Sequence, residues 1–231
     1  MSAPAAAPAV LVFDVNETLL DIGALAPLFT RLFGDGEVLR EWFAQLILHS
    51  QSATLSGHYA PLGALGAGVL RMLGAARGVP VGDAVVAELK RLTLGMPAHP
   101  DVLPALRRLR AANFRLVTLT NSAPDPDASP RARAGIAALV ERQFTVDAVR
   151  RFKPAPEVYR QVSDALALPG HALCMVAAHG WDLMGAQALG WRGALVERPG
   201  NAALPVPGLP RPDITAPDMG ALAEALAARW R

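Results

Sequence analysis

AVLVFDVNETLLD, residues 9–21, is the stretch that decides the fold of this 231-residue chain. Its apolar run ends at Asp14, and polar residues follow. A buried parallel strand reads as a continuous apolar run, and ligands bind beyond the carboxyl ends of such strands. Asn16 stands two residues after Asp14, where a second carboxylate would offer an acid for a poor leaving group. The stretch therefore predicts a carboxylate nucleophile at the mouth of a parallel sheet, with an amide in place of the acid.

The composition indicates a folded protein with a substantial core. Hydrophobic residues make up 52% of the chain and charged residues 18%, which argues against disorder. The net charge is +2, and the arginines are scattered without interleaved aromatics, so no nucleic-acid partner is expected. The single cysteine, Cys174, excludes an intrachain disulfide and a multi-cysteine metal site. No run has the length of a membrane span, and residues 1–10 lack the basic start of a secretory signal, so a soluble cytoplasmic protein is expected.

Strand-like and helix-like segments alternate along most of the chain. Further apolar runs occupy residues 114–120, 173–178 and 193–196. Helical patterns lie at residues 102–112, 130–140, 156–166, 183–189 and 219–230, the last after a proline-rich stretch, 198–217, that should wrap the surface. This alternation predicts an α/β fold with a doubly wound parallel sheet and right-handed crossovers.

One long interruption breaks the alternation. Between Asp21 and about His99 the sequence favours helices only, at residues 25–33, 38–54, 59–77 and 82–92. An insert of this size after the first strand suggests a helical lid over the carboxyl edge of the sheet. The predicted organisation is a core of residues 1–21 and 100–231 with a cap of residues 22–99.

Polar residues follow or flank the apolar runs in a fixed order. Asp14 ends the first run, Thr120, Asn121 and Ser122 end the second, Lys153 lies between elements, and Asp182 follows the third. Each alone has an ordinary structural explanation, such as a turn, a helix cap or a solvated lysine. Together, in this order on a doubly wound sheet, they predict one active site.

The motifs around these residues resemble those of the haloacid dehalogenase superfamily and, within it, of the type II 2-haloacid dehalogenases. The similar stretches are DVNETLLD (14–21), LVTLTNS (116–122), FKPAPEVY (152–159) and VAAHGWDLMGAQALGW (176–191). The resemblance spans nearly the whole chain, including the size and position of the helical cap. It implies a Rossmann-like core, a small haloacid as substrate, and a homodimer, since family members are commonly dimers.

The resemblance assigns a role to each matching residue. Asp14 is implied to attack C2 of the haloacid and form an aspartyl ester, which water then hydrolyses. Lys153 is implied to hold Asp14 ionised, and Asp182 to pair with Lys153 and help position the water. Thr120 and Asn121 are implied to bind carboxylates.

Other residues are expected to shape the substrate site: Asn16, Thr18, Trp42, Phe43, Tyr159 and Trp181.

Superfamily phosphatases need an acid two places after the nucleophile and a Mg²⁺ ion. Asn16 cannot supply that acid, and a halide leaves without a proton. The expectation is therefore a dehalogenase with no metal and no cofactor. The alternatives that stay open are a phosphatase that has lost or relocated its acid and an inactive relative that binds a small carboxylate.

Two departures from the family pattern fall on the halide side of the site. Well-studied members carry an Arg after the Trp of the first cap helix, where it helps receive the halide, whereas Phe43 follows Trp42 here. Arg40 either reaches in from nearby or forms a surface salt bridge. The last motif usually reads Ser-Ser-Asn, but this chain has Ala177, Ala178 and His179.

His179 has two interpretations on this pattern. It either serves the reaction, as a donor to the leaving halide or an activator of the water, or it only replaces the hydrogen bond of the amide. The aromatic residues Trp42, Phe43, Tyr59 and Trp181 either wall the pocket or pack the lid. A strong donor such as His179 would help most with fluoride, so fluoroacetate is a candidate substrate.

Overall fold

The computed structural model describes residues 8–123 and 135–230, and its centre is a six-stranded parallel sheet. The strands lie in the order β3-β2-β1-β4-β5-β6, and every neighbouring pair is parallel. Their bounds are β1 Val10–Phe13, β2 Arg115–Thr120, β3 Arg142–Thr145, β4 Leu173–Ala177, β5 Arg192–Val196 and β6 Ile214–Ala216. The predicted α/β fold with a doubly wound parallel sheet is confirmed, and β1 lies in its middle.

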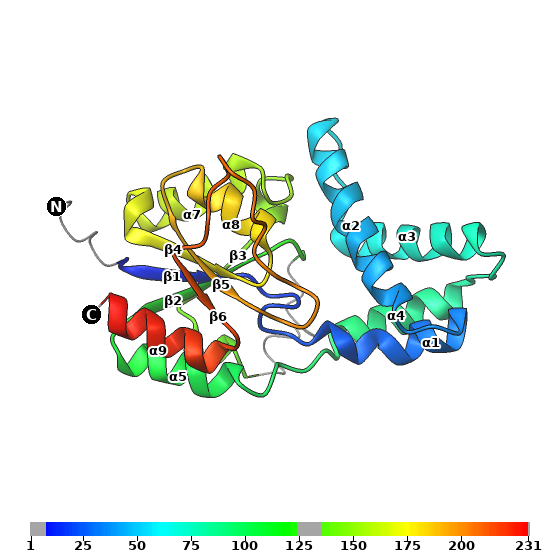
Figure 1. Cartoon of the computed structure of the whole chain (residues 1–231). Coiled ribbons are helices and arrows are strands. Elements are labelled where there is room, and N and C mark those ends of the chain that lie inside the picture. The colour runs from blue at the N-terminus through cyan, green and yellow to red at the C-terminus, as the bar shows by residue number, and fades with distance from the viewer. Residues whose placement is uncertain (1–7, 124–134, 231) are drawn as a thin grey trace.

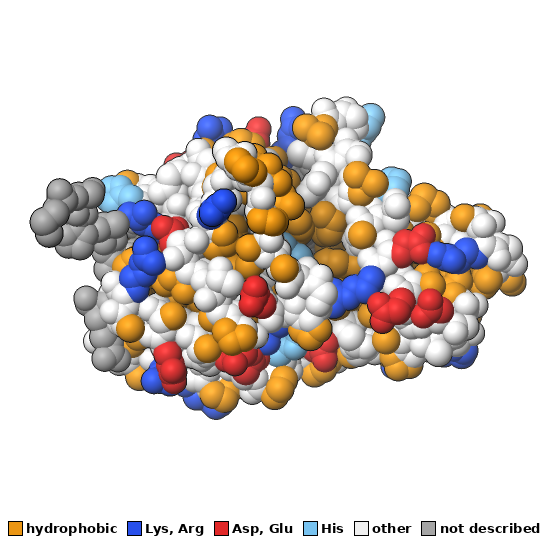
Figure 2. All heavy atoms as spheres, in the orientation of Figure 1, with side chains coloured by type: hydrophobic (Ala, Val, Ile, Leu, Met, Phe, Trp, Pro, Cys, Tyr) orange, Lys and Arg blue, Asp and Glu red, His pale blue; other side chains and the backbone are white. Residues whose placement is uncertain are grey.

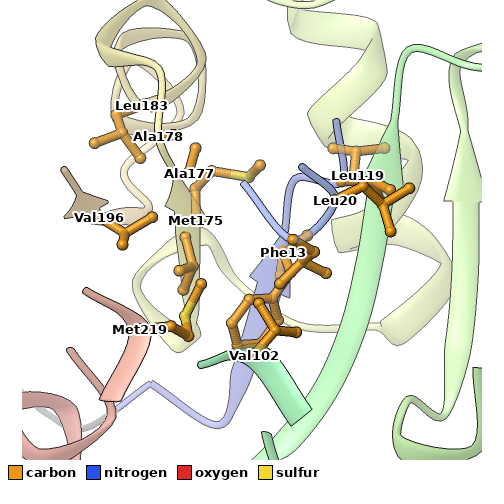
Figure 3. Packing of buried hydrophobic residues seen from close by; sticks show 14 of the residues in the cluster. Phe13, Leu20, Val102, Leu119, Met175, Ala177, Ala178, Leu183, Val196 and Met219 are labelled. Atoms are coloured by element: carbon orange, nitrogen blue, oxygen red, sulfur yellow. The ribbon is translucent and has the colours of Figure 1, made fainter. Parts of the chain in front are cut away.

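Helices cover both faces of this sheet (Figure 1). One face carries α5 (Val102–Ala111) and α9 (Met219–Arg229), and the other carries α7 (Pro156–Leu166) and α8 (Gly180–Gln187). Figure 3 shows how the core is filled: Phe13 of β1 lies against Val102 of α5, and Met175 of β4 lies near Met219 of α9. The four core strands that the apolar runs predict all form, because each is buried almost throughout.

The helical insert, residues 22–99, stands to one side of the sheet (Figure 1). It contains α1 (Ala26–Phe33), α2 (Val38–Leu55), α3 (Leu62–Ala76) and α4 (Asp83–Leu94). The chain leaves and re-enters the core side by side, through a bridge between Leu20 and Ala98. Figure 2 shows the surface hollowed where the insert meets the core, with hydrophobic side chains around the hollow. The division of the chain into two domains at these boundaries stays a prediction.

The structure departs from the sequence pattern at the sheet edges. β3 and β6 are not predicted, because β3 exposes Arg142 and Gln143 and β6 is only three residues long within the proline-rich tail. The helix predicted at 130–140 falls partly on residues 130–134, which lie outside the described residues, and residues 137–139 form a short 3₁₀ turn. Helix α3 begins at Leu62, later than predicted, because Pro61 precedes it. Among the described helices, none has both the length and the apolarity to cross a membrane.

Candidate active site

The site lies at the carboxyl edge of the three central strands. Asp14 directly follows β1, Asn121 directly follows β2, and His179 lies two residues past the end of β4. Because β1 is paired with both β2 and β4, the ends of these strands meet at one place. The backbone N–H of Asp14 donates to the carbonyl of Val176 at 2.9 Å, which ties the nucleophile candidate to β4.

Lys153 joins two carboxylates in the interior. Its ammonium nitrogen lies 3.0 Å from Oδ1 of Asp14 and 2.7 Å from Oδ2 of Asp182, and its side chain is 0% exposed. The hydroxyl of Tyr159 donates to the other oxygen of Asp182 at 2.7 Å. The predicted residues Lys153, Asp182 and Tyr159 thus lie in one hydrogen-bonded cluster with Asp14. The ammonium group of Lys153 is fixed between the two carboxylates.

The charge states in this cluster follow from burial and pairing. Burial alone would raise the pKa of Asp14, but the charge of Lys153 and the hydrogen bond from His179 bring that pKa well below its usual range. Burial would lower the pKa of Lys153, but Asp14 and Asp182 raise it. For Asp182, burial prevails over Lys153 and its pKa is raised. Asp14 is therefore ionised at neutral pH.

Threonine and amide side chains order the two loops beside Asp14. The hydroxyl of Thr18 donates to Oδ2 of Asp14 at 2.9 Å and accepts the N–H of Ala178 at 2.9 Å. The side-chain oxygen of Asn121 accepts the backbone N–H of Lys153 at 3.1 Å. Thr18 therefore orients the nucleophile candidate directly, whereas Asn121 fixes the loop that presents Lys153.

Thr120 and Asn16 meet at Ser122 and not at Asp14. The hydroxyl of Thr120 accepts the backbone N–H of Ser122 at 3.1 Å, and Asn16 donates to the hydroxyl of Ser122 at 3.2 Å. Asn16 therefore links the loops that follow β1 and β2. The predicted contact of Thr120 and Asn121 with a substrate carboxylate stays a prediction.

His179 lies between two carboxylates. Its Nδ1 is 3.3 Å from Oδ2 of Asp14, and its Nε2 is 2.8 Å from Oε2 of Glu17. Burial alone would lower the pKa of His179, but the hydrogen bonds with Asp14 and Glu17 raise it to about 9. The imidazole also stacks on Trp181, with ring centroids 5.1 Å apart, and Phe43 lies 5.6 Å away.

Glu17 is the residue of this site that the sequence pattern does not reveal. Its backbone has φ of 64°, a left-handed conformation that costs a non-glycine residue roughly 1 kcal/mol. Its carboxylate contacts both His179 and the guanidinium of Arg40, which also donates to the carbonyl of Pro199. The only signal in the sequence is a charged residue between Asn16 and Thr18, inside an otherwise uncharged turn.

A model of the haloacid dehalogenase-like hydrolases matches residues 8–190. The chain belongs to this family. A curated (S)-2-haloacid dehalogenase from Xanthobacter autotrophicus is 28% identical to this hydrolase over 196 residues, 84% of this chain and 77% of the relative. The predicted membership of the superfamily is confirmed.

Solved structures of the same family superpose well on this hydrolase. The crystal structure of an L-2-haloacid dehalogenase has a TM-score of 0.89 at 29% identity, covering 95% of this chain and 99% of that one. The crystal structure of a defluorinating L-2-haloacid dehalogenase has a TM-score of 0.77 at 26% identity and covers 95% of each chain. The shared fold includes both the sheet and the helical insert, since nearly the whole chain is covered.

The aromatic residues of the insert take different places in this hydrolase. Trp42 is 4% exposed, donates from its indole nitrogen to the carbonyl of Gly66 at 2.9 Å, and packs against Phe29. Trp42 therefore packs inside the insert, which is the second of its two expected roles. Its neighbour Phe43 lies beside His179. The structure brings only the second of these two candidates to the predicted site.

Tyr59 joins the insert to the loop that carries Lys153. Its ring stacks on Phe152 with centroids 5.2 Å apart, and its hydroxyl donates to Asp147 at 2.8 Å. The hydroxyl of Thr54 also accepts the N–H of Phe152 at 2.9 Å. The insert therefore rests on the core directly beside the lysine.

Proposed function

We propose that this hydrolase removes halide from small 2-haloacids and yields 2-hydroxyacids without a metal ion. The observation that carries the proposal is the ionised Asp14, held 3.0 Å from the fixed ammonium of Lys153, with Asn16 where an acid would be needed. The (S)-2-haloacid dehalogenases and L-2-haloacid dehalogenases among its relatives support the same substrate class.

In the first step, an oxygen of Asp14 attacks C2 of the haloacid. The carbon–oxygen bond of an aspartyl ester forms while the carbon–halogen bond breaks, and the halide leaves with the bonding electrons. The lowered pKa of Asp14 keeps its carboxylate ionised, and Lys153 and Thr18 orient it. Because the displacement occurs at C2 itself, the configuration at that carbon inverts.

In the second step, water adds to the carboxyl carbon of the ester. The bond between that carbon and the ester oxygen breaks, the oxygen takes a proton and leaves as the hydroxyl of the 2-hydroxyacid, and Asp14 is regenerated. The remaining proton is released, because the low pKa of Asp14 favours its ionised form. Asp182, held by Lys153 and Tyr159, is the group that we expect to orient the water.

Small polar groups at the strand ends are expected to bind the substrate carboxylate. Thr120 and Asn121 end and follow β2, and a backbone N–H or hydroxyl there suits a carboxylate. Phe43 and Trp181 flank His179 and suit the apolar part of the haloacid. We further expect that residues 22–99 form a cap domain over the core of each chain. We also expect that the protein is a homodimer.

A halide-release assay tests this proposal. The purified chain is assayed on fluoro-, chloro- and bromoacetate and on both enantiomers of 2-chloropropionate, with and without EDTA, and phosphate release from an aryl phosphate is measured in parallel. Halide release that EDTA leaves unchanged is expected. Phosphate release that depends on Mg²⁺, without halide release, would contradict the proposal.

The covalent step has its own test. Under single-turnover conditions in H₂¹⁸O, mass spectrometry should find the label in the peptide that contains Asp14. Label found only in the 2-hydroxyacid would mean that water displaces the halide directly.

Fluoroacetate is a further candidate substrate. One of the relatives is a defluorinating L-2-haloacid dehalogenase, and His179 offers a strong donor near Asp14. The variant His179→Asn should lose more activity on fluoroacetate than on chloroacetate. Equal loss on both substrates would contradict a role specific to fluoride.

A further inference from the structure

We propose that Glu17 is a positioning residue that holds His179 doubly protonated, so that His179 is a fixed cationic donor beside the nucleophile and not a base. The inference rests on the proposed function and specifies how its halide side is built. Glu17 takes no part in the two chemical steps of the proposed reaction, and a cationic His179 is a donor to the leaving halide and not an activator of the water.

The hydrogen bonds of the imidazole ring indicate its protonation state. Nδ1 faces a carboxylate oxygen of Asp14, and Nε2 faces a carboxylate oxygen of Glu17. An ionised carboxylate only accepts hydrogen bonds, and a neutral imidazole has one donor nitrogen and one acceptor nitrogen. A neutral ring would therefore place a lone pair against one of the two carboxylates. Only the imidazolium donates to both.

The charges around the ring also favour the imidazolium form of His179. On one side, Asp14 is paired with Lys153, which in turn is paired with Asp182. On the other side, Glu17 is paired with Arg40 from α2. The raised pKa of His179 and the lowered pKa of Glu17 agree with an ion pair between these two groups.

The place of Glu17 in the loop indicates that its carboxylate is needed there. The residue is 2% exposed, so it keeps a charged group away from water, and its φ is in the left-handed region that favours glycine. Glycine at this position would adopt the same backbone without strain. The contact between its carboxylate and Nε2 of His179 therefore accounts for a glutamate, and not a glycine, at this position.

Arg40 is engaged elsewhere and leaves the halide side to His179. Its guanidinium donates to Glu17 and to the carbonyl of Pro199, and Phe43 occupies the position after Trp42. When Asp14 becomes an ester, its negative charge disappears and a halide anion appears nearby. The N–H at Nδ1, which faced Asp14, is then available to that anion, and His179 keeps its proton throughout the step.

Two substitutions of Glu17 separate this role from a structural one. Glu17→Gln keeps an acceptor for Nε2 but removes the charge, and Glu17→Gly removes the side chain while suiting the left-handed backbone. NMR titration of the His179 ring should show its pKa lowered by about one unit or more in both variants. Glu88→Gln is the matched control, because Glu88 forms an exposed ion pair with Arg31.

The pH profile of halide release is the second measurement. With His179 as donor, kcat/KM on chloroacetate falls as pH rises through its pKa, at about pH 9 in the wild type. In Glu17→Gln the fall should occur at lower pH, with at least roughly threefold lower activity at pH 8.5 and nearly wild-type activity at pH 6. Lys153 does not blur this fall, because its pKa is raised and not lowered.

Three outcomes decide the matter. An unchanged His179 titration in both Glu17 variants would overturn the coupling. Activity that rises with pH through the His179 pKa would make the ring a base and overturn the donor role. If the wild type releases no halide from any 2-haloacid while the His179 titration still depends on Glu17, the coupling stands and the proposed function is what fails.

Discussion

The two oxygens of Asp14 are held in contrasting ways. Oδ1 meets Lys153, which is wholly buried and paired with Asp182, so this side is a closed ionic cluster inside the core. Oδ2 meets His179, which leads through Glu17 to Arg40, a side chain of the insert that is 39% exposed. The ion pairs of the first side join residues of the core only, whereas those of the second side include Arg40 of the insert.

This contrast separates two tasks of the proposed reaction. Ionising and orienting a nucleophile is the same task for every halide, and a rigid buried lysine suits it. Receiving the leaving group depends on the size and basicity of the halide, and a ring bordered by Phe43 and tied to the insert can adapt to it. Substitutions on the Oδ1 side should therefore affect all substrates, and substitutions on the Oδ2 side should change the preference among them.

The largest effect should come from Asp14 itself, where both sides meet. Asp14→Asn replaces the nucleophile with an amide, so halide release should fall at least about 10³-fold on every substrate. Circular dichroism of the variant should match the wild type, since the amide keeps the shape of the carboxylate. Substantial halide release by the folded variant would remove Asp14 from the role of nucleophile.

Lys153→Met should be the most damaging change to stability on the Oδ1 side. It leaves the buried carboxylates of Asp14 and Asp182 without their cation, which should cost about 3–5 kcal/mol of unfolding free energy. Urea denaturation at pH 7.5 measures this loss. The matched control is Lys90→Met, since Lys90 is exposed on α4 and is the only other lysine of the chain. Equal stability of the two variants would mean that the cluster is not ionic.

On the Oδ2 side, His179 should make stability depend on pH. Its folded pKa of about 9 lies above the unfolded value near 6.5, so the imidazolium stabilises the fold fully below pH 6.5. That contribution, about 3 kcal/mol at most, should be lost as pH rises through 9. Urea unfolding between pH 6 and 10 follows it, and His179→Asn should flatten the curve. A wild-type stability that rises over this range would contradict the charged ring.

The same contrast explains which features the sequence predicts. Asp14, Lys153 and Asp182 are found because each follows or precedes a recognisable element, so local patterns place them at one sheet edge. Glu17 is missed because its role depends on a left-handed backbone turn and on Arg40, which lies on a helix of the insert. Such long-range contacts leave no periodic signal.

The sheet follows the same logic. The central strands are predicted because burial on both faces makes them continuously apolar. The edge strands β3 and β6 are missed because β3 carries exposed polar residues and β6 is too short to show a pattern. Their pairing is decided by neighbouring strands, which no local window contains.

The smallest effect is expected at Trp42, and it tests which residues of the insert belong to the substrate site. Trp42→Phe removes the indole donor to the carbonyl of Gly66 and should cost about 1–2 kcal/mol, a decrease in Tm of a few degrees. Because Trp42 packs inside the insert, KM for chloroacetate should stay within about twofold of the wild type. The neighbouring change Phe43→Leu, beside His179, should instead alter the ratio of fluoroacetate to chloroacetate turnover with little change in Tm.

The substitutions at Trp42 and Phe43 distinguish the interior of the insert from the substrate pocket. If Trp42→Phe raised KM strongly with an unchanged Tm, Trp42 would belong to the substrate pocket, as the sequence alone allows. If Phe43→Leu left the ratio of the two substrates unchanged, the halide side would not extend to the insert. Its specificity would then reside in His179 and Glu17 alone, since Arg40 acts on the ring only through Glu17.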